Sequence, residues 1–327
     1  MNAEAILQVR GLGVDFATAR GRLHALDSVD LDVRRGSTLA VVGESGSGKS
    51  VLSRTILRLL PPSATVAAGA RILFDGEDLL ALDRAAIRSV RGRRIAMVFQ
   101  DPMTALNPVR TIGSQLSEGL RLHLGMKAAA AADRAVELLA TVGIASPTRR
   151  AGQYPHQLSG GMRQRVVIAM AIACEPELLI ADEPTTALDV TVQADILDLL
   201  ARLQADRRMT MILITHDLGI AAGRADEIAV MYAGRIVEKA PTREIFRRSR
   251  MPYTAALLRS IPRLDDPPHA RLSTIPGRPP VVFGNAQGCG FAPRCERVGS
   301  ACTERTPAMA ADEPGHDYRC WHPLEPV

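Results

Sequence analysis

Short runs of apolar residues, separated by turns that contain glycine, fill the first part of the chain. Alternating apolar and polar positions predict β-strands, and Arg35-Gly36 is predicted to form a turn. The first strands are expected at 6–9, 14–16, 29–33 and 39–42. Later runs predict strands at 71–74, 94–99, 178–180 and 211–215, and a hairpin over 228–237.

Helical periodicity alternates with these strands. Apolar positions recur at helical spacing over 52–60 and 111–143, and another helix is expected to open within the segment 158–165. An alanine-rich stretch at 128–132 fits plain helix propensity. Strands that alternate with helices predict an α/β fold with a sheet at its centre.

The segment between the fourth predicted strand and the first predicted helix fits the pattern G-x-x-x-x-G-K-[ST] at every fixed position. Its glycines let backbone N–H groups point into one concavity, and a helix that begins at about Lys49 adds the positive end of its dipole. Lys49 is expected to reach the β- and γ-phosphates, and the Ser50 hydroxyl to bind Mg²⁺. The sequence therefore predicts a P-loop that binds a nucleotide through Gly43, Glu44, Ser45, Gly46, Ser47, Gly48, Lys49, Ser50 and Val51.

Two further segments point to phosphate chemistry. Ser159, Gly160 and Gly161 stand at the predicted start of a helix, where N–H groups and the helix dipole receive anions. Asp182 and Glu183 follow a buried strand, at the sheet edge where α/β proteins place ligand chemistry. Asp182 is expected to hold Mg²⁺, and Glu183 to act as a base or to orient a water.

Three other side chains are candidates for the nucleotide site. His216 ends a strand at the same sheet edge and is expected to contact a phosphate, although a histidine at a strand end is often structural. Phe16 is expected to stack on the adenine ring, the alternative being a place in the core. His24 is a second candidate for the adenine neighbourhood.

Composition bounds the class of protein. A chain of 327 residues is long enough for one large domain and an appendage. The formal net charge of +5 fits phosphate ligands or a membrane-side location, and does not by itself argue for nucleic-acid binding. Without a long apolar window or the pattern of a signal peptide, we expect a cytosolic chain whose membrane role comes through partner subunits.

Six motifs, in a fixed order over about residues 5–240, resemble the ATP-binding subunits of ABC transporters. They are the P-loop, the loop at Gln100, the signature 158–165, the two acids, the D-loop Ala187-Leu188-Asp189 and the switch His216. The resemblance implies that Glu183, His216 and Gln100 are catalytic and that Mg²⁺ is held by Ser50, Gln100 and Asp182. It also implies that a second ATPase subunit presents its ATP to Ser159, Gly160, Gly161, Gln164 and Asp189.

Other stretches resemble the oligopeptide, dipeptide and nickel importer group, at 99–102, 105–108, 154–157, 252–254 and 257–262. This resemblance implies a P-loop α/β domain over 1–250, with an antiparallel β subdomain and a helical subdomain at about 101–170. It implies a small irregular extension over 251–327. The implied partners are a paralogous ATPase subunit, two transmembrane permease subunits and, indirectly, an extracytoplasmic solute-binding protein, with no nucleic acid. The chain is then expected at the cytoplasmic face of the cell's inner membrane, where it drives uptake of oligopeptides or dipeptides.

Other functions compete with peptide import. The same ATPase role in an importer of nickel or another small solute is an alternative, and a non-transport ABC ATPase is a further one. A DNA-repair or chromosome-maintenance ATPase would insert a long coiled coil between Gln100 and Ser159, which are only 59 positions apart. A translation-type ATPase would carry two sets of motifs, and a non-enzymatic module would lack one of the two acids, which are both present.

Four of the five cysteines, Cys289, Cys295, Cys302 and Cys320, lie within 32 residues of a tail whose turns include Pro267-Pro268. Such a tail lacks the apolar content to order itself, and metal ligation supplies folding energy. Zn²⁺ prefers closer pairs of cysteines, a reducing compartment disfavours disulfides, and the clustering argues against unrelated thiols. The hypothesis favoured here, and by the family resemblance, is an iron–sulfur cluster, most simply [4Fe–4S], with zinc as the alternative.

Overall fold

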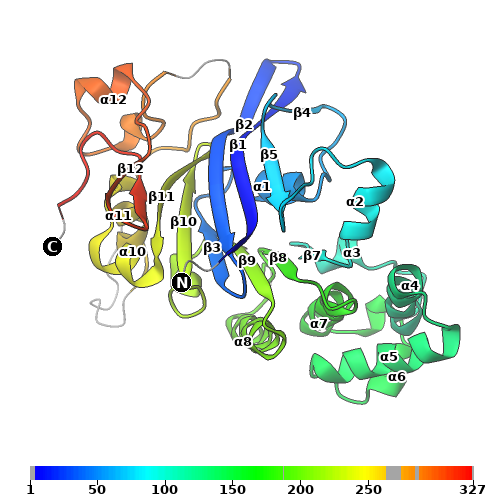
Figure 1. Ribbon diagram of the computed structural model, residues 1–327. Helices are drawn as coiled ribbons and strands as arrows, with labels where there is room; N and C mark the ends of the chain where they lie inside the picture. The colour runs from blue at the N-terminus through cyan, green and yellow to red at the C-terminus, as the bar shows by residue number, and fades with distance from the viewer. Residues whose placement is uncertain (1–3, 187, 263–273, 284–286, 326–327) are drawn as a thin grey trace. The chain divides into compact units, whose positions relative to one another are not determined.

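The structure is a computed structural model that describes residues 4–186, 188–262, 274–283 and 287–325. Ala187 of the expected D-loop and Pro267-Pro268 lie outside the described residues. The chain forms two compact units, one made of 1–80 and 213–327 and the other of 81–212. Figure 1 labels most of the helices and strands of both units.

The first unit contains most of the strands. Its elements are β1 Ala5–Thr18, β2 Gly21–Arg34, β3 Thr38–Val42, α1 Lys49–Ile56, β4 Ala64–Val66, β5 Arg71–Phe74, β6 Glu77–Asp78, α9 Leu218–Ala222, β10 Glu227–Tyr232, β11 Arg235–Pro241, α10 Thr242–Arg248, α11 Pro252–Arg259, the 3-10 helix η2 Ala292–Arg294, α12 Ser300–Glu304, β12 Ala310–Glu313 and β13 His316–Tyr318.

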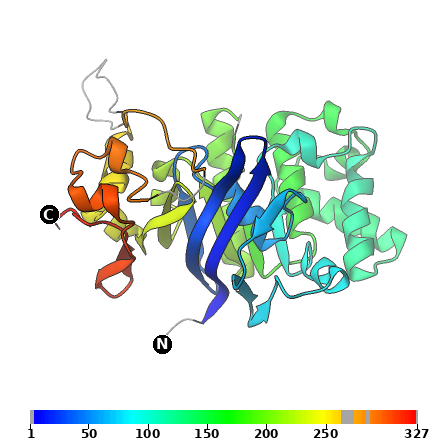
Figure 2. The ribbon, with the colours of Figure 1, turned by 90° about the horizontal axis from the view of Figure 1, so that it is seen from above.

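An antiparallel sheet in this unit is built on two long strands, β1 and β2, which run side by side (Figure 2). β4 and β5 pair with β1, and β6 pairs with β5. The expected strands 6–9 and 14–16 proved to be parts of the single strand β1. Register shifts between Val9 and Val14 absorb the glycines that interrupt the apolar pattern, so the strand continues past them as a series of bulges.

A second set of strands in the first unit has the order β12-β13-β11-β10-β3. β3 pairs with β10 in parallel, Val41 lying opposite Ala229, whereas β10 and β11 form the predicted antiparallel hairpin. All five residues of β3 are buried, which explains its continuous apolar sequence. β13 of the C-terminal extension pairs with β11, a contact that the irregular sequence of the tail did not predict.

The second unit is mostly helical. Its elements are α2 Arg84–Val90, β7 Ile95–Val98, α3 Pro102–Ala105, α4 Ile112–Leu124, α5 Ala128–Thr141, α6 Pro147–Ala151, the 3-10 helix η1 Pro155–Gln157, α7 Gly160–Ile172, β8 Leu178–Asp182 and α8 Val190–Arg207; β9 Thr210–Thr215 crosses the division into the first unit.

Within the second unit, β7 and β8 pair in parallel, and α4 packs against α5, α6 and α7. The predicted helical stretch 111–143 divides at Gly125, whose positive φ of 65° ends α4.

The strands and helices of the two units together confirm the α/β class predicted from the sequence. Among the residues that the structure describes, no helix is both long and apolar enough to cross a membrane.

Candidate functional site

The P-loop of the first unit connects the buried strand β3 to helix α1, as predicted. Gly46 and Gly48 have φ values of 82° and 105°, which a residue with a Cβ rarely adopts. The Lys49 side chain turns back along the loop, and its Nζ donates to the carbonyl oxygens of Gly43 at 2.7 Å and Glu44 at 3.0 Å. The lysine is thus held over the concavity that phosphates would enter.

The P-loop also carries a buried polar atom that suits an anion. Ser47 is only 2% exposed, and its Oγ has no hydrogen-bond partner among the described residues. A buried hydroxyl without a partner is costly, and a phosphate oxygen at the start of α1 would accept its hydrogen. Ser45 and Gly46 are exposed, whereas Ser50 and Val51, at the start of α1, are half-buried.

The catalytic candidates of the second unit lie at the end of β8. Asp182 is the last residue of this strand and is 1% exposed, and Glu183 follows it. The Gln100 side-chain amide and the Thr186 hydroxyl both donate to Glu183 Oε2, each at 3.1 Å. Glu183 has a φ of 46°, a strained conformation for a residue with a Cβ and one that concentrates at functional sites. Gln100 and Glu183, 83 positions apart, are therefore brought together as one group.

The signature residues begin α7, as expected. Ser159 is its N-cap and accepts the Met162 N–H at 3.3 Å. Ser159 and Gly160 are exposed, and Gly161 lies so close to α8 that a Cβ there would be 2.6 Å from Val192 Cγ1. Gln164, in contrast, is 1% exposed, and its Nε2 has no hydrogen-bond partner among the described residues. Its side chain therefore faces the interior.

The remaining candidates have more local partners. Asp189 is exposed and caps α8 by accepting the Val192 N–H at 2.9 Å. His216 is exposed directly after β9. Phe16 is half-buried on β1, paired with Leu23 and Ala64 in the neighbouring strands. His24 Nδ1 lies 2.5 Å from Asp15 Oδ1, so its ring is engaged within the sheet.

The predicted site residues are thus distributed over both units. The first unit holds the P-loop, Phe16 and His216, and the second holds Gln100, Asp182, Glu183, the signature residues and Asp189. The shared Mg²⁺ site of Ser50, Gln100 and Asp182 draws on both units and stays a prediction.

Two residues of the C-terminal extension support the P-loop and were not assigned to the site from the sequence. Tyr253 Oη accepts the Glu44 N–H at 2.9 Å, and burial raises the pKa of this phenol. Arg294 forms an ion pair with the Glu44 carboxylate. Their partner is 209 and 250 positions away along the chain, and no local pattern signals contacts at such separations.

The four clustered cysteines influence one another. The Cys289 N–H donates to the Cys302 carbonyl at 2.7 Å, and all five cysteines of the chain are free thiols. Burial raises the pKa of Cys320 to about 11, and the nearby thiols of Cys289, Cys295 and Cys302 add to the shift. In the described part of the chain, however, no group of three or more His, Cys, Asp or Glu side chains is arranged to hold a metal ion.

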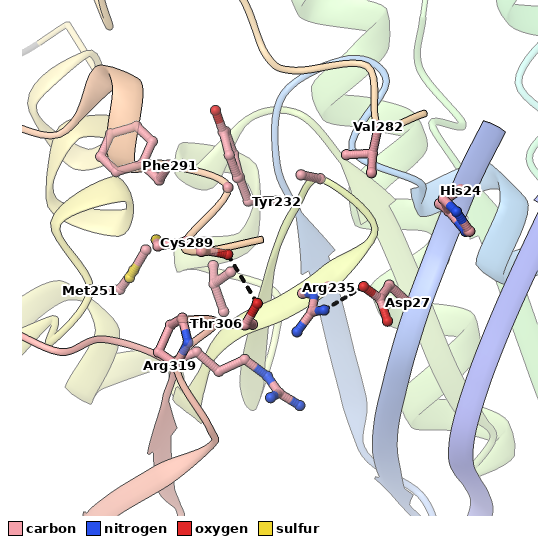
Figure 3. A pocket seen from close by; sticks show the side chains of 15 residues that line it. His24, Asp27, Tyr232, Arg235, Met251, Val282, Cys289, Phe291, Thr306 and Arg319 are labelled. Carbon is pink, nitrogen blue, oxygen red and sulfur yellow. Dashed lines mark hydrogen bonds and ion pairs between the residues drawn. The ribbon is translucent and has the colours of Figure 1, made fainter. Parts of the chain in front are cut away.

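A cavity of about 580 Å³, including the space at its mouth, lies beside Cys289 (Figure 3). Tyr232, Phe291 and Met251 form an apolar wall on one side of it. Arg235 is paired with Asp27 on β2 and Arg319 donates to the Ile236 carbonyl at 3.1 Å. His24, the second candidate for the adenine neighbourhood, is among the described residues that line this cavity, whereas the P-loop residues, Phe16 and the catalytic candidates are not.

Comparison with known proteins places the chain in a family. Residues 26–186 match the family described as ABC transporter, and residues 237–302 match the one described as oligopeptide/dipeptide transporter, C-terminal region. A Brucella melitensis protein, provisionally named a peptide import ATP-binding protein, is 50% identical over 98% of each chain. The dipeptide transport ATP-binding protein DppD of Bacillus subtilis is 48% identical over 97% of this chain and 95% of its own.

Solved structures agree with this placement. A dimeric, post-hydrolysis state of the ATP-binding cassette MJ0796, bound to ADP and phosphate, matches with a TM-score of 0.65 at 28% identity, over 72% of this chain and 99% of that one. The chain therefore belongs to the ABC transporters, as one of their ATP-binding, ATP-hydrolysing subunits. Within that class, its C-terminal region makes it a member of the oligopeptide/dipeptide transporter branch.

Proposed function

We propose that this chain hydrolyses ATP to drive the import of oligopeptides or dipeptides. The observation that carries the ATPase part is the Glu183 carboxylate, which follows the buried strand β8 and is held by Gln100 and Thr186. The peptide part is supported by the C-terminal family match and by relatives named for dipeptide and oligopeptide transport. Identification of the solute that co-purifies with the assembled transporter tests the peptide part, and nickel as that solute would contradict it.

Each predicted site residue has its own role in the proposed binding and hydrolysis of ATP. P-loop N–H groups and Lys49 bind the phosphates of ATP, and Glu183 accepts a proton from the water that attacks the γ-phosphate. Gln100 keeps that carboxylate in place, and His216 contacts the γ-phosphate. Ser50, Gln100 and Asp182 would hold Mg²⁺, which when bound neutralises charge on the β- and γ-phosphates.

The complete site is proposed to need a second ATPase subunit. Ser159 and Gly160 are exposed at the start of α7, where they can receive the ATP of a partner, and Asp189 is exposed at the start of α8. Because Gln164 is buried, we expect it to support α7 from within. The MJ0796 cassette, a structural relative, is dimeric in its ADP-bound state.

A glutamine in place of Glu183 tests the catalytic assignment. Glu183→Gln keeps the size and hydrogen-bonding ability of the side chain but removes the base. In the assembled transporter, ATP hydrolysis should fall by about 10²–10⁴-fold while ATP binding is kept, so that the ATP-closed dimer accumulates. Steady-state phosphate release, nucleotide-binding titration and size-exclusion chromatography measure these three quantities.

Lys49→Ala is the matched control, since it should weaken ATP binding itself. Hydrolysis by Glu183→Gln at the wild-type rate would show that another group activates the water. Wild-type chain that bound no ATP would contradict the proposed function as a whole.

The proposed partners are a paralogous ATPase subunit and two transmembrane permease subunits, with an extracytoplasmic solute-binding protein acting through them. The chain would then sit at the cytoplasmic face of the membrane as a peripheral subunit. Exposed apolar side chains on and around the helices of the second unit support a docking role for this unit. They are Phe99, Met103, Val109, Leu122, Leu124 and Tyr154.

We further propose that Cys289, Cys295, Cys302 and Cys320 ligate a [4Fe–4S] cluster. Burial raises the pKa of Cys289, Cys295 and Cys320, the nearby thiols add to each shift, and these three cysteines pack on the apolar cluster around Tyr232 and Phe291. The proposal rests on the clustering of the four cysteines within 32 residues and on their spacing, which lacks the close pairs that Zn²⁺ prefers.

Anaerobic purification tests the cluster. Brown protein with broad absorption near about 400 nm and about four irons per chain is expected, and Cys295→Ser should lose both. Cys174→Ser is the matched control, because Cys174 lies outside the four-cysteine segment in the second unit. Colourless protein with one stoichiometric zinc would overturn the assignment.

A further inference from the structure

An arginine from the C-terminal extension reaches the second residue of the P-loop. Arg294 Nη1 and Nη2 donate to Glu44 Oε2 and Oε1 at 2.7 and 2.9 Å, a bidentate pair in which the guanidinium matches the carboxylate edge to edge. The arginine side chain is 5% exposed and the glutamate side chain 24%. Because the pair is largely shielded from water, its attraction is screened much less than that of a surface ion pair.

The guanidinium is fixed on its remaining sides. Nε donates to the Pro276 carbonyl at 2.7 Å, Nη2 to the Ile275 carbonyl at 3.3 Å, and Nη1 to Tyr232 Oη at 3.2 Å. Its carbon also lies 5.9 Å from the centre of the Phe291 ring. An arginine held by this many contacts cannot turn away from Glu44 without breaking several of them at once.

Glu44 is in turn held at three points. Its carboxylate binds Arg294, its N–H donates to Tyr253 Oη at 2.9 Å, and its carbonyl accepts from Lys49 Nζ at 3.0 Å. Lys49 is the side chain expected to bind the phosphates. Arg294 is therefore connected to the Lys49 ammonium group through a single residue, Glu44.

We propose that Arg294 is a positioning residue for nucleotide binding, acting through Glu44 on the P-loop. It neutralises a carboxylate that would otherwise repel the phosphates, and it fixes the first turn of the loop before ATP arrives. The inference rests on the proposed function in one respect, that the P-loop binds ATP. It requires no metal at the cysteines.

The test measures ATP affinity of the full chain by titration and the KM and kcat of the assembled transporter. In Arg294→Gln the dissociation constant and KM for ATP should rise about tenfold, while kcat stays within about twofold, since the hydrogen bonds of Arg294 described above all go to residues of the first unit and none to the proposed base Glu183. Adding Glu44→Gln to this variant should restore most of the affinity, because the unpaired charge is then gone. Arg294→Lys, which keeps the charge but loses the fork geometry, should fall between, at about threefold.

Arg259→Gln is the matched control, since Arg259 also belongs to the first unit but pairs at 3.7 Å with Glu296, whose side chain is 81% exposed. Arg294→Gln that binds ATP within about twofold of the wild type would overturn the proposal, even if its melting temperature falls. If that variant does not fold, Arg294→Lys decides: unchanged affinity overturns the proposal and weakened affinity supports it. ATP binding by the wild type, lost in Lys49→Ala, shows separately whether the P-loop functions.

Discussion

Gly43, the first residue of the P-loop, is required by packing as well as by phosphate binding. A Cβ at this position would lie 2.1 Å from the Met231 carbonyl oxygen and 3.0 Å from Ser47 Oγ. Met231 belongs to β10, which pairs in parallel with β3, so the loop leaves the sheet in direct contact with its neighbouring strand. The glycine thus serves the strand contact and the motif at once.

Gly43→Ala should therefore destabilise the protein by about 3 kcal/mol, because the carbonyl that it meets is backbone and cannot rotate away. Gly46→Ala is a useful comparison, since Gly46 has a φ of 82° but no neighbouring atom of the described residues within 4 Å of its would-be Cβ. That variant should cost only the conformational strain, about 1 kcal/mol. Urea unfolding without nucleotide measures both, and an equal loss in the two variants would refute the packing argument.

Glu183 and Lys49 show how far a motif predicts its own geometry. Glu183 lies after β8 and Lys49 at the start of α1. Both positions were predictable, because an apolar run in the sequence precedes each motif. The hydrogen bond from Gln100 to Glu183 joins two motifs that the sequence shows only as separate segments. Motif spacing therefore predicted where these residues lie along the fold, and the structure supplies which of them touch.

At the scale of elements, one buried carboxylate joins the C-terminal extension to the sheet. Glu238 on β11 is fully buried and accepts the N–H groups of Arg250 and Met251 at 2.6 and 3.1 Å. His316, the first residue of β13, lies 2.8 Å from it through Nε2. A single side chain thereby provides hydrogen-bond partners for the turn before α11 and for β13, the strand that extends the sheet.

Glu238→Gln should lower stability by about 2 kcal/mol, since an NH₂ group would then face N–H donors in a buried site. The loss should be accompanied by faster proteolysis near β13, because that strand depends on the contact. Glu313→Gln is the control: Glu313 pairs with Arg248 at the exposed surface and should cost less than about 1 kcal/mol. Thermal unfolding with limited proteolysis distinguishes the two, and equal effects would argue against a special role for Glu238.

The same elements explain why the tail was the least predictable part of the fold. Its polar and proline-rich sequence has weak periodicity, so β12, β13 and α12 left no clear signal. The order comes instead from distant partners: Tyr253 and Phe291 pack on Tyr232, and β13 pairs with β11. Where a contact depends on residues far apart in the chain, local propensity carries little information about it.

For the whole molecule, the docking role proposed for the second unit leads to a cross-linking prediction. Val109 and Leu122 of this unit are 79% and 76% exposed. Apolar side chains gathered at a surface mark places where another protein binds. Photo-reactive groups placed at these two positions should capture the transmembrane subunits in the assembled transporter.

Val298, 49% exposed on the extension, is the control position and should capture neither subunit. Capture from Val298, with none from Val109 or Leu122, would place the membrane subunits on a different surface.

The division into units also sets an order for biosynthesis. The second unit is one continuous stretch, so it can complete its contacts while the ribosome is still translating the chain. The first unit cannot, because β3 gains its β10 partner only when residues near 230 emerge, and Glu44 gains Arg294 later still. A nascent chain that stopped before residue 294 would display every nucleotide-binding motif and lack the arginine that steadies the first of them. The P-loop can therefore reach its final form only after nearly the whole chain has been synthesised.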